Sequence, residues 1–130
     1  LDRKKRWHGF RAYAASKLMN ILFAREAARR FPGAVAVNAQ HPGVVASGFG
    51  LGDGGIINAW YTVTKRFLKT PEQGADTSVW LALSPDVQGV TGRYFCQRKE
   101  HRALPSSKDP ELARALWDES ERLTGIALPA

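Results

Sequence analysis

The stretch that decides the fold covers residues 12–47 and reads AYAASKLMNILFAREAARRFPGAVAVNAQHPGVVAS. Apolar residues recur at three- and four-residue spacings in its first part, and this periodicity predicts an amphipathic helix over 12–31. A Pro-Gly pair ends that helix, because proline cannot continue it. The valine-rich run at 34–40 then predicts a short buried strand, which a His-Pro-Gly loop terminates.

The rest of the chain continues this alternation of helix and strand. A helix is expected over 70–83, because Thr70 can accept from a free backbone N–H and Gln73 completes a capping box. A second strand is expected at 92–97, after a turn that contains glycine. The last helix is expected over 109–123, where leucines line one side.

The order helix, strand, helix, strand, helix predicts an α/β fold with parallel strands. Two strands rarely form a stable sheet alone, and the strand at 34–40 has the composition of a central strand with neighbours on both edges. We therefore expect 1–130 to be a single partial domain that contributes to a larger sheet.

Composition and charge are those of a globular protein with a basic surface. Hydrophobic residues make up 44% of the chain, which argues against disorder. The formal net charge is +7, and part of it lies in the run Arg3 to Arg6. A solvated surface is the favoured interpretation and no nucleic-acid partner is expected, but a basic polyanion-binding protein is an alternative. A salt-sensitive affinity for nucleic acid would support that alternative.

The cysteine content and the apolar segments indicate the cellular compartment that we expect for the protein. Cys96 has no second cysteine to pair with, so we expect a reducing, cytoplasmic setting. No apolar run approaches the ~18 residues that span a bilayer. Cysteine and histidine show no metal-ligand spacing, so no metal is expected.

The strongest chemical signal is the pair Tyr13 and Lys17 on the first helix. They are four positions apart, so both side chains lie on the same face of the helix, one turn from each other. An ammonium close to a phenol favours the phenolate form. Such a tyrosine can pass a proton to or from a substrate oxygen.

These residues, and the loop His41-Pro42-Gly43 that follows about 30 residues later, resemble the short-chain dehydrogenase/reductase family. Within it, the chain looks most like the retinol dehydrogenase-like branch. The resemblance extends to the helix around Trp117 and covers nearly the whole chain. It implies the C-terminal part of a doubly wound Rossmann-type parallel sheet, and an oxidoreductase that uses NADP or NAD.

The resemblance also implies how the proton-transfer residues act. Tyr13 would be the general acid/base at the carbonyl or alcohol oxygen. Lys17 would hold the nicotinamide ribose hydroxyls and support the ionised form of the tyrosine. Ser16 matches a small residue common in this branch and need not be catalytic.

Cofactor-binding roles also fall on the Pro-Gly loop by resemblance. Pro42 and Gly43 would line the nicotinamide ring. The backbone of Val45 and the hydroxyl of Ser47 would hold the carboxamide. His41 would lie close by, and its simplest interpretation is a loop histidine bonded to backbone.

Other parts of the family pattern do not occur in this sequence. The glycine-rich phosphate loop, and with it the N-terminal dinucleotide-binding half, is missing, and the glycines at 48–55 follow the catalytic helix with the wrong spacing. None of the twelve residues before Tyr13 is a serine, so the serine that polarises substrate oxygen is missing too. An alternative is therefore a catalytically silent fragment that acts at most as an interaction module.

The segment at about 48–69 is by resemblance a substrate lid, and it suggests which substrates and partners to expect. Its aromatic residues suggest a small-molecule carbonyl or alcohol substrate that is apolar, such as a retinoid, steroid or lipid aldehyde. Its amphipathic part, 56–69, could also rest on a membrane surface, although the lid is favoured. A homo-oligomer is expected, because the helix that carries Tyr13 often packs in a dimer interface of this family.

Overall fold

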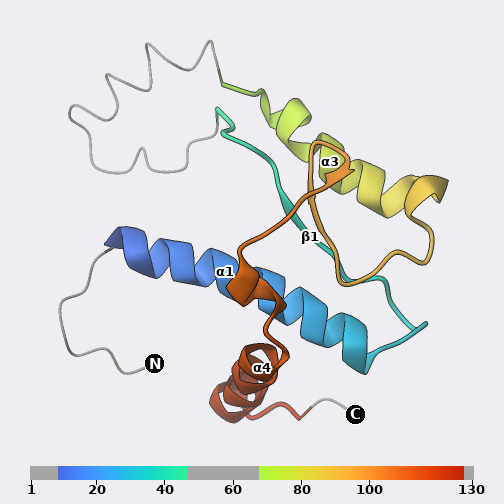
Figure 1. Cartoon of the computed structure of the whole chain (residues 1–130). Coiled ribbons are helices and arrows are strands. Elements are labelled where there is room, and N and C mark those ends of the chain that lie inside the picture. The colour runs from blue at the N-terminus through green and yellow to red at the C-terminus, as the bar shows by residue number, and fades with distance from the viewer. Residues whose placement is uncertain (1–8, 47–67, 128–130) are drawn as a thin grey trace. The chain divides into compact units, whose positions relative to one another are not determined.

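The computed structural model describes residues 9–46 and 68–127 (Figure 1). The chain divides into two compact units, and each is described by itself below. The first unit takes residues 1–39, 89–94 and 101–130, and the second takes 40–88 and 95–100.

The first unit is built around helix α1, Gly9–Arg30, which confirms the helix predicted at 12–31 and begins three residues earlier. Its C-terminal half has the buried apolar residues Leu22, Ala24 and Ala27. All residues from 9 to 17 are exposed. The burial of α1 is therefore confined to its second half, within the described part of the chain.

Helix α4, Pro110–Thr124, packs against α1, and the two ribbons lie next to each other in Figure 1. Its caps are encoded locally. The Asp109 side chain accepts hydrogen bonds from two backbone N–H groups of the first turn, and Gly125 ends the helix at φ +69°. A short 3₁₀ helix, η3 (Pro105–Lys108), contacts both helices.

Aromatic packing holds α1 and α4 together around Trp117, which is only 2% exposed. Phe23 stacks on the Trp117 ring at 5.0 Å between centroids, and Phe31 tilts against it at 6.1 Å. The Arg30 guanidinium lies 4.9 Å from the same ring, a cation–π arrangement. The indole N–H donates to Glu121 at 2.9 Å, so the polar edge of the ring is also satisfied.

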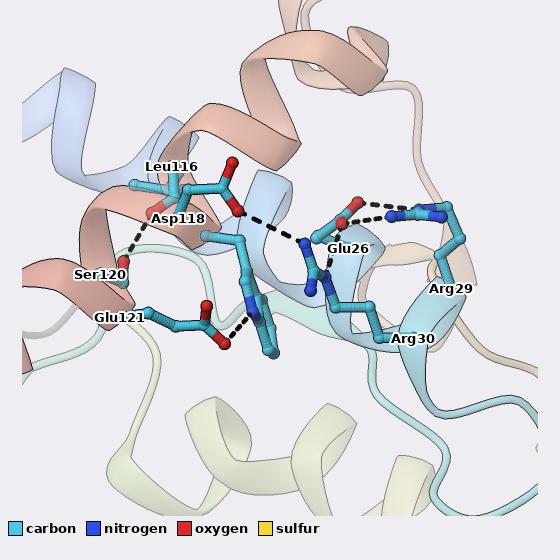
Figure 2. Close-up of polar contacts among 8 residues, drawn as sticks. Glu26, Arg29, Arg30, Leu116, Asp118, Ser120 and Glu121 are labelled. Carbon is cyan, nitrogen blue, oxygen red and sulfur yellow. Dashed lines mark hydrogen bonds and ion pairs between the residues drawn. The ribbon is translucent and has the colours of Figure 1, made fainter. Parts of the chain in front are cut away.

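A buried carboxylate on α1, Glu26, interacts with two arginines of the same helix (Figure 2). Glu26 is 2% exposed and accepts hydrogen bonds from Arg29 at 2.6 Å and from Arg30 at 2.8 Å. Arg30 also reaches Asp118 of α4 at 3.5 Å. The buried charge is thus compensated by two guanidinium groups, and one of them continues to the neighbouring helix.

The strand predicted at 34–40 is shorter than expected. Strand β1 covers only Ala39–His41. Before it, side chains replace part of the backbone ladder: Val37 N–H donates to the Thr91 hydroxyl, and the Asn38 amide donates to the Val90 carbonyl. The prediction of a strand from residue 34 was wrong, because these polar side chains take over the pairing.

The second unit contains helix α3, Pro71–Leu83, as its main element. The predicted capping box is present, since Gln73 N–H donates to the Thr70 hydroxyl and Thr70 N–H donates to the Gln73 side chain. A 3₁₀ turn, η2 (Pro85–Val87), follows the helix. Trp80 meets Phe95 edge-on at 5.7 Å, and Phe95 is buried.

The second predicted strand, 92–97, is also shorter, because β2 covers Tyr94–Cys96. A third strand that the sequence did not indicate, β3 (Lys99–Glu100), pairs with β2 antiparallel, and the sheet order is β1-β2-β3. The expectation of a wholly parallel sheet is therefore corrected. A tight turn at Gln97 and Arg98 reverses the chain, and both of its residues have positive φ.

Parts of the sequence interpretation lie outside the described residues. They include the basic run at the N-terminus, Ser47, and the expected lid except for its last two residues. Among the described residues, no helix is long and apolar enough to cross a membrane.

Candidate active site

Helix α1 brings Tyr13 and Lys17 together, as their spacing predicts. The Lys17 Nζ lies 5.2 Å from the centroid of the Tyr13 ring. Both residues are exposed, and the tyrosine keeps 46% of its surface accessible. The pair is therefore open to a ligand, with a positive charge held against the face of the phenol.

Ser16 occupies the same turn but is engaged within the helix. Its hydroxyl donates to the Tyr13 carbonyl oxygen at 2.7 Å. This bond keeps the hydroxyl on the backbone of α1. The expectation that Ser16 need not be catalytic stays a prediction.

Pro42 and Gly43 follow β1 in a turn that needs glycine. Gly43 has φ +87°, a conformation that residues with a side chain rarely adopt. The Gly43 N–H donates to Nδ1 of His41 at 2.6 Å, so His41 is bonded to backbone as its simplest interpretation predicted. Lys69 Nζ donates to the Pro42 carbonyl oxygen at 3.0 Å.

Val45 lies in a parallel β-bridge with Lys69. The bridge uses Lys69 N–H to the Val44 carbonyl at 3.1 Å, and Ala46 N–H to the Lys69 carbonyl at 2.8 Å. In such a bridge the N–H and C=O of the central residue point to the opposite side of the strand. The N–H and C=O groups of Val45 therefore face away from Lys69.

Helix α3 packs against the side chain of Val45. A Cβ built on Gly74 would lie 2.6 Å from a Val45 methyl carbon, so the glycine permits a close approach. Gly74 is buried, and Val45 is partly buried. Lys69 and Gly74 thus support the loop, a role that the sequence did not indicate, because their contacts are to residues 23 to 29 positions earlier.

The six predicted site residues fall into three groups. Tyr13 and Lys17 belong to the first unit, and Pro42, Gly43 and Val45 belong to the second. Ser47 lies outside the described residues. The assignment of all six to catalysis and cofactor binding stays a prediction.

The chemistry of these residues fits a nicotinamide dinucleotide. Lys17 offers three N–H donors for ribose hydroxyls. Gly43 has no side chain, and Lys69 lies where its Cβ would project. Val45 offers one donor and one acceptor of the kind that a carboxamide needs. Tyr13 can donate or accept a proton at an oxygen.

The described residues combine helices and strands with a Tyr-x-x-x-Lys helix and a Pro-Gly turn. Comparison with known proteins gives three informative relatives. Retinol dehydrogenase 14 of Mus musculus is 49% identical over 118 residues, which are 88% of this chain and 35% of that protein. Retinol dehydrogenase 13 of Homo sapiens is 38% identical over 126 residues, 92% of this chain and 38% of that protein. The WW domain-containing oxidoreductase of Danio rerio is 33% identical over 121 residues, 92% of this chain and 29% of that protein.

The chain belongs to the short-chain dehydrogenase/reductase family, in its retinol dehydrogenase-like branch, and corresponds to a C-terminal portion of that family's domain. It spans about a third of the length of the curated relatives that it matches. No family model matches the chain. The family predicted from the Tyr13 helix and the Pro-Gly loop is therefore confirmed.

Proposed function

We propose that this chain provides the proton-transfer helix and the cofactor loop of an oxidoreductase that uses NADP or NAD to interconvert an alcohol and a carbonyl. The observation that carries the proposal is the position of the Lys17 ammonium over the Tyr13 ring. The oxidoreductase names of the relatives support it.

In this proposal Tyr13 donates its hydroxyl proton to the carbonyl oxygen during reduction and accepts a proton from the alcohol during oxidation. Lys17 stabilises the negative charge that appears on the phenolic oxygen when the proton leaves. When bound, the nicotinamide supplies the hydride in one direction and accepts it in the other.

The Pro42–Val45 loop is assigned to cofactor orientation. The loop begins where β1 ends at His41, and ligands of doubly wound sheets bind outside the carboxyl ends of the strands. We place the chain in such a Rossmann-type sheet. Its helices, its strand β1 and its family support that placement.

The proposed substrate is an apolar carbonyl or alcohol, such as a retinoid, a steroid or a lipid aldehyde. Support comes from the names of two relatives, which are retinol dehydrogenases. Steroid and alkyl substrates are included because the aromatic residues expected in the lid, Trp60, Tyr61 and Phe67, suit apolar substrates of either kind.

An assay of NADPH and NADH oxidation tests the proposal, with retinal, a steroid ketone and an alkyl aldehyde as substrates. Any longer protein that contains this sequence is assayed in parallel with the 130-residue chain. Tyr13→Phe is expected to lower kcat by about 10²- to 10⁴-fold, the contribution of a positioned general acid. Turnover that survives this substitution would contradict the role of Tyr13.

A catalytically silent interaction module is the second candidate. Cofactor binding by the isolated chain distinguishes the two candidates. A chain that neither binds NADPH or NADH nor turns over substrate in any form supports the silent module.

A further inference from the structure

Lys69 lies directly against the Pro-Gly turn through its side chain. Its Nζ donates to the Pro42 carbonyl oxygen at 3.0 Å. A Cβ built on Gly43 would be 3.0 Å from the same Nζ and 3.1 Å from Cε. The ammonium and its stem therefore occupy the space beside the turn that the glycine leaves open.

The main chain of Lys69 holds the next part of the loop. Its N–H donates to the Val44 carbonyl, and its carbonyl accepts from the Ala46 N–H. One residue thus fixes the loop at three carbonyl or amide groups, two through its backbone and one through its ammonium. Val45, between the two backbone bonds, can move little without breaking one of them.

The Asp76 carboxylate is a second possible acceptor for the Lys69 ammonium, and it already accepts a hydrogen bond from Arg98. The Asp76 carboxylate lies near enough for Lys69 to contribute to the lowering of its pKa, but a hydrogen bond from Arg98 is the largest cause. Arg98 Nε donates to that carboxylate at 2.8 Å. Asp76 thus has Arg98 as its hydrogen-bond partner, and the Lys69 ammonium donates to the Pro42 carbonyl oxygen.

The geometry points to Lys69 as the residue that positions the Pro42–Val45 loop, by pinning the Pro42 carbonyl with its ammonium. The consequence for the cofactor rests on the function proposed above, which assigns this loop to the nicotinamide. Lys69 acts through the loop and does not itself take part in proton transfer. A peptide carbonyl held by an ammonium has a fixed plane, so the loop presents Gly43 and Val45 in one orientation.

Hydrogen exchange of the purified chain tests the pinning without any cofactor. The variant Lys69→Met removes the ammonium and keeps the stem, Lys69→Arg restores a donor, and Lys99→Met controls for loss of an exposed lysine in the same unit. Exchange of the Gly43 and Ala46 amides should become about fivefold faster in Lys69→Met, as expected when a local hydrogen bond is lost. Lys69→Arg should recover most of the protection, and Lys99→Met should not change it.

Thermal melts accompany this experiment, and similar melting temperatures for all four proteins show that the changes are local. Unchanged exchange at residues 43 and 46 in Lys69→Met would overturn the proposal, whatever the activity. Faster exchange throughout α3 as well would reduce Lys69 to a general stability residue and overturn it too.

Cofactor kinetics provide the second readout, in the longest form of the protein that turns over substrate. The KM for NADPH or NADH should rise about five- to tenfold in Lys69→Met while kcat at saturating cofactor stays nearly constant, because the loss is in positioning before chemistry. An unchanged KM alongside faster exchange would overturn the link to the cofactor. If the wild type binds no cofactor, the proposed function fails, and the exchange experiment alone decides whether Lys69 positions the loop.

Discussion

At the scale of single residues, the approach of α3 to Val45 depends on the missing side chain of Gly74. Helix propensity alone predicts that Gly74→Ala raises the free energy of unfolding by about 1 kcal/mol. Here the new Cβ would meet a Val45 methyl at 2.6 Å, and the backbone bonds to Lys69 keep Val45 from moving away. Overpacking of this kind costs about 1–3 kcal/mol, so we expect a net loss of stability.

A double-mutant cycle measured by urea denaturation checks this prediction. Val45→Ala removes the opposing methyl groups, and in that background Gly74→Ala should become stabilising because only its helix propensity remains. Additive effects of the two substitutions would show that Gly74 and Val45 do not make the close contact.

The sequence predicts some site residues well and others not at all, for a physical reason. Tyr13 and Lys17 meet because helical geometry alone brings positions four apart onto one face. Lys69 and Gly74 act on residues far back in the chain, and nothing in their neighbours indicates that contact. A lysine before a helix cap is usually a solvated charge, so only the fold reveals its bond to Pro42.

At the scale of elements, the β2–β3 hairpin turns through two residues that are both strained. Gln97 has φ +53° and Arg98 φ +59°, in the left-handed region that costs non-glycine residues about 1–2 kcal/mol. Arg98 is held there by Asp76 and by its N–H bond to the Thr77 hydroxyl at 3.2 Å. We therefore expect Gln97→Gly to raise the free energy of unfolding by about 1 kcal/mol, measured by urea denaturation.

The matched variant is Arg98→Gly, which relieves the same strain but removes the ion pair with Asp76. Arg98→Gly should raise the free energy of unfolding by less than Gln97→Gly does. Equal stabilisation by both variants would show that the Arg98 side chain contributes nothing to the hairpin.

The α1–α4 pair should respond to acid through Glu26. The hydrogen bond from Arg29 is the largest cause that lowers the pKa of this carboxyl below its ordinary value of 4.5, against the opposing effect of burial. A carboxyl whose pKa is lower in the folded state stabilises the protein above its unfolded pKa, and this contribution is lost as the pH falls below about 4.5. Glu26→Gln should lower stability at neutral pH by about 1–3 kcal/mol, because a buried charged hydrogen bond is lost.

Thermal melts from neutral pH to about pH 3 check the Glu26 prediction, and the variant should lose less stability on acidification than the wild type does. Glu119→Gln is the control, since Glu119 pairs with Arg122 at the surface of α4 and such pairs contribute little. A Glu26→Gln protein as stable as the wild type at neutral pH would contradict the role of this carboxylate.

Helices and strands differ in how far the sequence determines them. The caps of α3 and α4 are local, and the structure confirms them at Thr70 and Asp109. The strands were predicted too long, because Asn38 and Thr91 replace backbone pairing with side-chain bonds. Strand β3 was missed because its turn contains neither glycine nor asparagine, the usual indications of a two-residue hairpin.

At the scale of the whole molecule, family membership and surface exposure together predict behaviour in solution. The chain spans about a third of the length of its relatives. The N-terminal half of α1, which carries Tyr13, is exposed at every residue from 9 to 17. An exposed apolar stretch of this kind is where we expect association with another copy.

We expect the 130-residue chain to self-associate through this part of α1, and sedimentation over a wide concentration range measures it. Phe10 is 84% exposed, and Phe10→Ser should shift the chain toward monomer because it removes the largest exposed apolar group there. Leu123→Ser is the matched control, since Leu123 is 65% exposed but lies on α4. If the wild type is monomeric at all concentrations and melts in one cooperative transition, the uncovered half of α1 is no association surface. If both variants reduce association equally, the contact is a general property of the apolar surface and not of the helix that carries Tyr13.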